Sequence, residues 1–160
     1  MKLLTTFLTI LLLTLLSSPS WSTPFADLVE RDGLYYPKFS EIPFTGEVNG
    51  KSQGSLKNGK KDGDWVSFHS NGQLRYKGNY NNGEQEGVWV TYYDTGQVRY
   101  KYNYKNGEKE GVTVENYSNG MLLYKCNYIN GKKEGICFFY NELGELRSKD
   151  NYKDGVKIGD

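Results

Sequence analysis

Hydrophobic and polar residues alternate along several short stretches of the chain. In residues 74–80, leucine and tyrosine occupy one set of positions, whereas Arg75, Lys77 and Asn79 occupy the other. Residues 98–104 repeat this alternation. A period of two with one polar side predicts antiparallel strands whose sheet is wetted on one face. No apolar stripe of helical spacing occurs in this part of the chain, which argues against helices there.

The alternating pattern returns with a period of 24 residues. Within each period, a first strand rich in valine and aromatic residues is followed by a glycine turn, the alternating second strand and another glycine turn. A strict period of this size marks a repeat architecture, in which each unit buries its apolar side against its neighbours. The sequence therefore predicts an all-β fold, a single-layer antiparallel β-meander of tandem 24-residue hairpins.

The same period divides the chain into segments. We expect a signal segment (1–22), a lead-in or N-terminal cap (23–42) and a repeat domain (43–160), which comprises a shortened repeat (44–62) and four full repeats (63–86, 87–110, 111–134 and 135–158). Terminal repeats are expected to be atypical because one side lacks a neighbour.

The first 22 residues have the composition of a targeting segment. Lys2 precedes an apolar run over residues 3–16, and Ser20-Trp21-Ser22 provides small residues before a cleavage site. The run is shorter than the roughly 20 residues that a membrane span needs. We therefore expect a secretory signal peptide, with an uncleaved membrane anchor as the alternative, and a periplasmic or extracellular protein.

The charge of the exported chain is balanced. Without the one lysine of the signal segment, 19 basic residues face 19 acidic ones. This balance argues against nucleic acid as a partner, since binding to phosphates needs a basic surface. Several basic residues still recur at equivalent repeat positions and would line one side of the sheet: Arg75, Arg99, Arg147, Lys77, Lys101, Lys125 and Lys149. A solvated outer face and a binding stripe are both consistent with this ladder.

Tyrosine dominates the apolar side of the pattern. All 14 tyrosines follow the signal segment. Large amphipathic rings suit a single-layer sheet, which cannot bury a thick core, and the exposed face of such a sheet is the usual contact surface of repeat proteins. The candidate binding face comprises Trp65, Trp89, Tyr76, Tyr100, Tyr124, Arg75, Arg99, Lys77 and Lys101.

Two cysteines fall on neighbouring predicted strands. With a turn centred near residues 131–132, Cys126 and Cys137 lie opposite one another. Directly paired antiparallel residues have Cα atoms about 4.5–5.5 Å apart, which allows a disulfide. An oxidising compartment favours that bond, and a pair of small apolar side chains is the alternative. No further cysteine or histidine lies nearby to complete a metal site.

The sequence contains no recognisable catalytic set. The single histidine, His69, has Tyr93, Tyr117 and Asn141 as its repeat equivalents, so it occupies a generic position. Acidic residues recur before each repeat glycine, at Asp62, Glu86, Glu110 and Glu134. Lysines are interspersed with them, which favours a salt-bridged turn surface over a calcium site. We expect a non-enzymatic protein without a cofactor.

The first full repeat, GDWVSFHSNGQLRYKGNYNNGEQE, resembles the MORN repeat variant. The pattern is similar in particular to the bacterial YwqK family of toxin–antitoxin antitoxins, over about residues 33–160, including the PFTGEV stretch at 43–48. The resemblance implies a sheet of consecutive hairpins that serves as an interaction module. Thr113 and Cys137 replace the tryptophan of the pattern, and Asn116 replaces an aromatic residue, so the later repeats are expected to contribute less to a tryptophan-lined face.

These observations together predict an exported interaction module that binds another protein, in keeping with an antitoxin or immunity role. Two alternatives remain. The rings could form an aromatic cleft for a small cationic or cell-wall glycan ligand. The basic ladder could instead attach the protein to anionic lipid.

Overall fold

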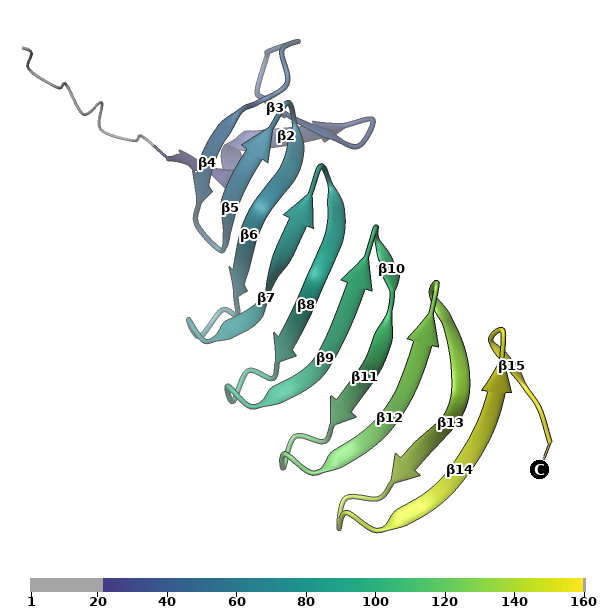
Figure 1. Ribbon diagram of the computed structural model, residues 1–160. Helices are drawn as coiled ribbons and strands as arrows, with labels where there is room; N and C mark the ends of the chain where they lie inside the picture. The colour runs from purple at the N-terminus through teal and green to yellow at the C-terminus, as the bar shows by residue number, and fades with distance from the viewer. Residues whose placement is uncertain (1–21, 160) are drawn as a thin grey trace, which may run out of the picture.

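One long antiparallel sheet makes up most of the protein. The computed structural model describes residues 22–159 and contains no α-helix among them. Thirteen strands form this sheet, and from β4 onward they follow one another in chain order (Figure 1). The predicted all-β meander of tandem hairpins is confirmed.

The sheet begins with β1 (Thr23–Pro24), which pairs in parallel with β4 (Gly46–Asn49). The strands that follow are β5 (Ser52–Lys57), β6 (Lys60–Phe68), β7 (Leu74–Asn81), β8 (Glu84–Tyr92), β9 (Val98–Lys105), β10 (Glu108–Lys109), β11 (Gly111–Asn116), β12 (Leu122–Ile129), β13 (Lys132–Tyr140), β14 (Leu146–Lys153) and β15 (Val156–Lys157). A short 3-10 helix, η1 (Phe25–Asp27), leads into a separate two-stranded sheet of β2 (Leu28–Arg31) and β3 (Leu34–Pro37).

Two-residue turns join the strands along one long side of the sheet, at the same end of every hairpin. In the β7–β8 turn, Asn82 and Gly83 have φ angles of 50° and 92°. Two successive positive φ angles define the turn whose twist matches that of a hairpin, and asparagine followed by glycine is its preferred sequence. The turn thus ends at Gly83, and β8 begins at the next residue.

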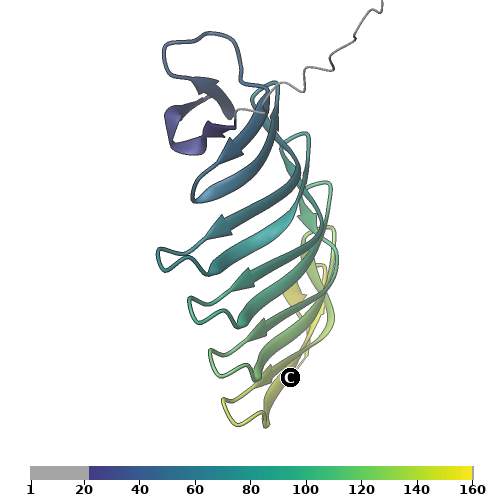
Figure 2. The same ribbon diagram turned by 90° about the vertical axis from the view of Figure 1, so that its left-hand side faces the viewer.

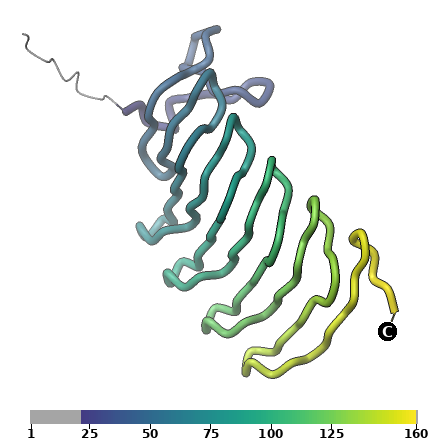
Figure 3. The backbone as a smooth tube through the Cα atoms, viewed as in Figure 1, coloured from purple at the N-terminus to yellow at the C-terminus, as the bar shows by residue number. Residues whose placement is uncertain are grey.

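The repeat glycines form bulges inside strands instead of turns. Lys77 pairs with Val90 and Asn79 pairs with Glu86, so residues 87–89 of β8 lie opposite a single residue of β7. Gly87 has a φ of 66°, which a glycine adopts without strain. Bulges bend a strand and increase its twist. Every hairpin is bowed in the same direction (Figure 3), and the sheet is therefore a curved trough.

The tyrosines lie on the inner face of this curve. The hydroxyls of Tyr124 and Tyr128 approach to 3.2 Å although the residues are four apart on β12. On a straight strand the Cα atoms of residues four apart are about 13 Å apart. The two side chains therefore converge, which places them on the concave side of the bent strand. On the outer face, Val88 and Val112 are half exposed, at 54% and 51%.

The N-terminal residues close one end of the trough. Residues 25–37, here termed the cap segment, lie beside the first strands of the sheet (Figure 2). The Phe25 ring packs 5.5 Å from Trp65, over a core that includes Val48 and Leu56. Tyr35 anchors the segment by donating its backbone N–H to the carbonyl of Gly59 at 2.8 Å.

The predicted signal peptide lies outside the described residues except for Ser22. Within residues 22–159, none of the helices has the length and apolar character needed to traverse a membrane.

Candidate binding surface

The two tryptophans of the predicted binding face are core residues. Trp65 is fully buried and Trp89 is 4% exposed. Each indole N–H donates to a backbone carbonyl of the preceding strand at 3.1 Å. The prediction that they contact a partner is therefore wrong. The reason is that each indole lies across a glycine of the neighbouring strand, Gly54 or Gly78, where no side chain keeps it away.

The same two positions are filled differently along the repeats. Residues 11 apart face each other on the inner side of the sheet as four couples: Gly54–Trp65, Gly78–Trp89, Tyr102–Thr113 and Cys126–Cys137. The first three couples each combine a large ring with a small residue, and the fourth is a disulfide. At the third couple the ring comes from Tyr102 of β9 and the small residue is Thr113 of β11, and both line the same hollow. The sequence carries this signal only when positions 11 apart are compared.

A disulfide joins Cys126 and Cys137. Their Cα atoms are 4.3 Å apart, and both side chains are buried. The sequence pattern predicted that the two cysteines would pair directly across the two strands. They do not pair directly in the structure. Lys125 pairs with Phe138 and Asn127 with Glu134, so Cys126 lies opposite a bulge that ends at Cys137.

The arginines and lysines of the predicted basic ladder lie on opposite faces. Ser67 pairs with Tyr76 and Phe68 with Leu74, which leaves Arg75 unpaired in a bulge of β7. A bulge breaks the strict alternation of side chains. Arg75 consequently lies with the tyrosines, and its Cζ is 5.7 Å from the Tyr76 ring centroid.

Arg99 repeats this arrangement, with its Cζ 4.9 Å from the Tyr100 ring centroid. By contrast, Lys77 pairs with Val66 and Val90, and Lys101 pairs with Val90 and Val114, on the outer face. The prediction of one continuous ladder is wrong because a bulge moves Arg75 and Arg99 to the face of the tyrosines. The assignment of Lys77 and Lys101 to the binding face is also wrong, because regular alternation keeps them on the outer face.

The three predicted tyrosines do form one row on the inner face. Tyr76 packs 5.7 Å from Trp89, Tyr100 stacks 5.2 Å from Tyr102, and Tyr124 packs 5.1 Å from Phe139, measured between ring centroids. All three are half-buried. The structure thus places Tyr76, Tyr100 and Tyr124 on one face with Arg75 and Arg99, and Trp89 packs beneath Tyr76.

Hydrogen bonds orient two of these tyrosines. Burial raises the pKa of Tyr100, and a hydrogen bond to the Glu115 carboxylate raises it further. Burial likewise raises the pKa of Tyr124, with a smaller contribution from its hydrogen bond to Tyr128. Both phenols therefore stay protonated well above neutral pH and can act as hydrogen-bond donors.

The sequence analysis missed a row of lysines on the inner face. The Lys109 Nζ lies 4.4 Å from the Tyr102 ring centroid, and the Lys133 Nζ lies 4.7 Å from the Tyr152 ring centroid. Lys61 occupies the same row, and its burial lowers its pKa. The available signal was their position one residue before each acidic residue, which places them on the opposite side of the strand.

Two neighbouring hollows lie on the inner face beyond the cap segment. The larger, about 430 Å³, is here termed the tyrosine hollow and includes Tyr100, Tyr102, Thr113, Glu115, Tyr124 and Lys133 in its lining. The smaller, about 310 Å³, is termed the arginine hollow and includes Arg75, Thr91 and Arg99. Tyr100 and Tyr102 belong to both, so the hollows are neighbours along the trough.

Four stretches of the chain, residues 61–82, 85–106, 109–130 and 133–154, match the family described as MORN repeat variant. The chain belongs to this family. MORN repeats are in general modules for interaction with proteins or membranes, and the proteins built from them are typically non-enzymatic. Each matched stretch begins at the inner-face position held by Lys61 in the first MORN repeat and ends at the first residue of a two-residue turn. None of the curated proteins compared with the chain matches it.

The histidine has a structural contact between successive MORN repeats. The Nε2 of His69 lies 3.0 Å from the carbonyl oxygen of Tyr92, to which it donates. In the next repeat, the Tyr93 hydroxyl donates to the equivalent carbonyl, that of Asn116, at 2.8 Å. His69 therefore replaces a tyrosine hydroxyl in a contact that joins neighbouring repeats.

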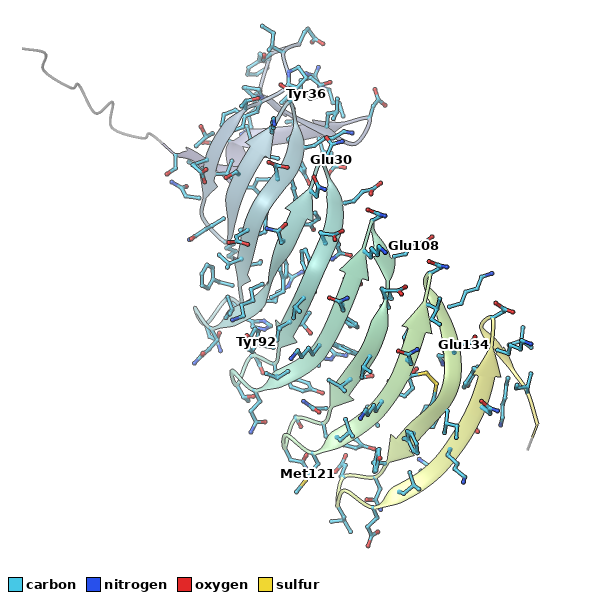
Figure 4. The ribbon with its side chains drawn as sticks, viewed as in Figure 1. Glu30, Tyr36, Tyr92, Glu108, Met121 and Glu134 are labelled. Atoms are coloured by element: carbon cyan, nitrogen blue, oxygen red, sulfur yellow. A yellow bond between two sulfur atoms is a disulfide. The ribbon has the colours of Figure 1, made fainter. Side chains whose placement is uncertain are left out.

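The recurring acidic residues each hold the two-residue turn of the next hairpin along the chain. The Glu86 carboxylate accepts a hydrogen bond from the backbone N–H of Asn106 at 2.9 Å, and Glu134 accepts one from Asp154 at the same distance. Figure 4 shows Glu134 and Glu108 along the edge of the two-residue turns, with Tyr92 and Met121 along the opposite edge. The prediction of salt bridges is wrong here, because none of the ion pairs of residues 22–159 includes these acids. Within the same residues, no cluster of three or more histidine, cysteine or acidic side chains could hold a metal ion.

Proposed function

We propose that this protein is an exported, non-enzymatic module that binds another protein with the inner face of its MORN repeats. The observation that carries this proposal is the row of half-buried tyrosines, Tyr76, Tyr100 and Tyr124, flanked by Arg75 and Arg99. Tyrosine and arginine are enriched among the residues that dominate binding energy at protein interfaces. Because packed rings hold this row, little side-chain freedom is lost on binding.

The cap segment supports a polypeptide as the ligand of the trough. It covers the inner face at the first repeat, where Phe25 packs on Trp65 and Tyr35 packs 5.0 Å from Phe25. The inner face of the later repeats carries the same kinds of side chain without such a cover. A segment of a second protein would bury these rings as the cap segment buries Trp65.

The resemblance to YwqK antitoxins supports an inhibitory or immunity-like role. An exported protein does not meet a toxin that acts in its own cytoplasm. The partner that we propose therefore lies in the periplasm or outside the cell, as the expected signal peptide requires. Fractionation and intact-mass analysis of the mature protein test export, which predicts loss of residues 1–22.

Site-specific photo-crosslinking in the native cells tests the binding face. A photoreactive phenylalanine replaces Tyr76 on the inner face or, as the control, Lys101 on the outer face. We expect a discrete cross-linked protein from position 76 and not from position 101. Loss of the cross-link in a Tyr100→Ala/Tyr124→Ala variant would support the tyrosine row, whereas equal cross-linking from both faces would overturn the proposal.

The outer face favours a second candidate function, attachment to anionic lipid. Val88, Val112 and Ile136 are about half exposed there. Exposed lysines, including Lys77 and Lys101, lie on the same face. Apolar side chains with basic neighbours are typical of surfaces that bind anionic membranes. Sedimentation with phosphatidylglycerol vesicles tests this candidate, which predicts that Lys77→Gln/Lys101→Gln releases the protein and Tyr100→Ala does not.

A further inference from the structure

The cap segment places an acidic residue opposite the lysine row of the trough. Glu30 of β2 and Lys61 of β6 line the same hollow of about 390 Å³. The carboxylate opposes the lowering of the Lys61 pKa by burial. It also accepts a hydrogen bond from the Tyr35 hydroxyl of the same segment. At the first repeat, the trough thus holds a polypeptide that supplies both a carboxylate and aromatic rings.

Lys109 and Lys133 hold the equivalent position in the MORN repeats 109–130 and 133–154, away from the cap segment. Lys109 and Lys133 are half-buried against tyrosine rings. None of the ion pairs found in residues 22–159 includes either of them. A half-buried ammonium retains much of its attraction for a carboxylate, because solvent screens it less than a fully exposed charge.

A buried hydroxyl lies in the same place. Thr113 is only 3% exposed, and its Oγ1 has no hydrogen-bond partner. Thr113 lines the tyrosine hollow. Buried polar groups are nearly always hydrogen-bonded, so an unpaired hydroxyl beside a hollow points to a polar group of a ligand. Thr91, in the lining of the arginine hollow, has an unpaired hydroxyl of the same kind.

We propose that the tyrosine hollow binds an acidic polypeptide segment of the partner protein, with a side-chain carboxylate between Lys109 and Lys133 and a polar group on the Thr113 hydroxyl. This inference rests on the proposed function and names the chemistry of its partner. Glu115 lies in the same hollow and hydrogen-bonds with Tyr100. It repels a second carboxylate and so restricts the acidic group of the segment to the lysine side.

The geometry argues against a small cationic ligand in this hollow. A cage for a quaternary ammonium needs open ring faces. Here the Lys109 ammonium already lies 4.4 Å from Tyr102 and 5.3 Å from Tyr128. Lys133 lies 5.4 Å from Tyr124. The cations of the protein itself thus occupy the rings that such a ligand would need.

Fluorescence anisotropy with a labelled peptide tests the proposal on the full mature chain. The probe is the sequence of residues 25–37, and its control copy carries amides in place of Asp27, Glu30 and Asp32. The variant Lys109→Gln/Lys133→Gln adopts the glutamine that the second repeat has at this position, Gln85. We expect this variant, and the amide peptide, to weaken binding by about tenfold or more.

A matched variant of equal charge separates the hollow from general electrostatics. Lys101→Gln/Lys125→Gln removes two lysines from the outer face and is expected to change the affinity by less than about twofold. Thr113→Val, which keeps the shape of the side chain, is expected to weaken binding by about three- to tenfold. Equal losses from both lysine pairs, or undiminished binding of the amide peptide, would overturn the inference.

Two further outcomes would reassign the hollow. Selective binding of an acidic oligosaccharide in place of the peptide would make the ligand a glycan. Concentration-dependent dimerisation that Lys109→Gln/Lys133→Gln abolishes would make it a second copy of this chain. Photo-crosslinking from position 76 that persists in Lys109→Gln/Lys133→Gln would contradict this inference and leave the proposed function standing. Absence of cross-linking in the unaltered background would contradict the proposed function itself.

Discussion

The indole of Trp89 lies directly on the backbone of Gly78. A methyl group added at Gly78 would come within 2.2 Å of the Trp89 Cδ2 atom, far inside van der Waals contact. Tyr80 and Tyr104 surround the same indole at centroid distances of 4.9 and 6.3 Å. The missing side chain of Gly78 therefore creates the space in which a single-layer sheet buries a tryptophan.

Gly78→Ala is expected to destabilise the protein by about 2–3 kcal/mol because the added methyl overpacks the site. In a Trp89→Ala background the same change is expected to cost less than about 0.5 kcal/mol, since the clash is gone. Urea unfolding followed by circular dichroism measures both values. An equal cost in the two backgrounds would show that backbone effects, and not the indole, account for the loss.

The disulfide is expected to replace the stabilisation that a glycine–tryptophan couple provides in the earlier repeats. Cys126→Ala/Cys137→Ala should lose about 2–3 kcal/mol, the value for closing so short a loop. Cys126→Gly/Cys137→Trp introduces the residues of the Gly78–Trp89 couple at this place. This variant should recover at least about half of the loss. Thermal and urea unfolding of the three proteins test this prediction, and equal stability of the two variants would contradict it.

His69, Tyr93 and Tyr117 each donate a hydrogen bond to the next repeat, so a tyrosine should be tolerated at position 69. The Tyr117 hydroxyl donates to the carbonyl oxygen of Tyr140 at 2.9 Å, so Tyr117→Phe should cost about 1 kcal/mol. His69→Tyr should leave stability unchanged within about 0.5 kcal/mol, because a tyrosine hydroxyl makes the same contact in the next repeat. A large loss in His69→Tyr would indicate a role of the imidazole beyond this hydrogen bond.

Alkaline pH should weaken the inner face through Tyr80. Burial, followed by repulsion from Tyr76 and Tyr104, raises its pKa to about 12, from 10.0 in the unfolded chain. A raised pKa contributes stability that is complete below pH 10 and is lost as the pH rises toward 12. Tyr80→Phe should reduce this loss by about 1 kcal/mol, after allowance for solvent screening. Urea midpoints at pH 9 and pH 11.5 measure it, and an unchanged loss in Tyr80→Phe would exclude this tyrosine as the source.

The sequence was sufficient to predict the meander because glycine turns and alternation act locally. It placed Tyr76, Tyr100 and Tyr124 on one face correctly, since regular pairing continues through these residues. It failed for Arg75 because the alternation rule assumes an unbroken ladder, and a bulge one residue long reverses the side on which a residue lies. It failed for Trp65 because the exposed fraction of a side chain depends on the neighbouring strand, where Gly54 has no side chain and leaves space for the indole.

The tyrosine hollow was beyond prediction for a similar reason. Thr113 was interpreted as a loss from the aromatic pattern because each repeat was compared with the consensus of the others, and Glu115 was not singled out. Their meaning depends on Tyr102 of β9, which lines the same hollow. Differences between repeats that compensate in pairs are therefore more informative about the site than the residues that all repeats share.

The carboxylates that hold the turns have a consequence for the history of this protein. The Glu110 carboxylate accepts a hydrogen bond from the backbone N–H of Asn130, 20 residues later, so each turn is held by a side chain from the hairpin before it. A duplication of 24 residues leaves every such bond intact, wherever its boundaries fall. Such a duplication would add one further hairpin to the trough and would extend its inner face by the same step.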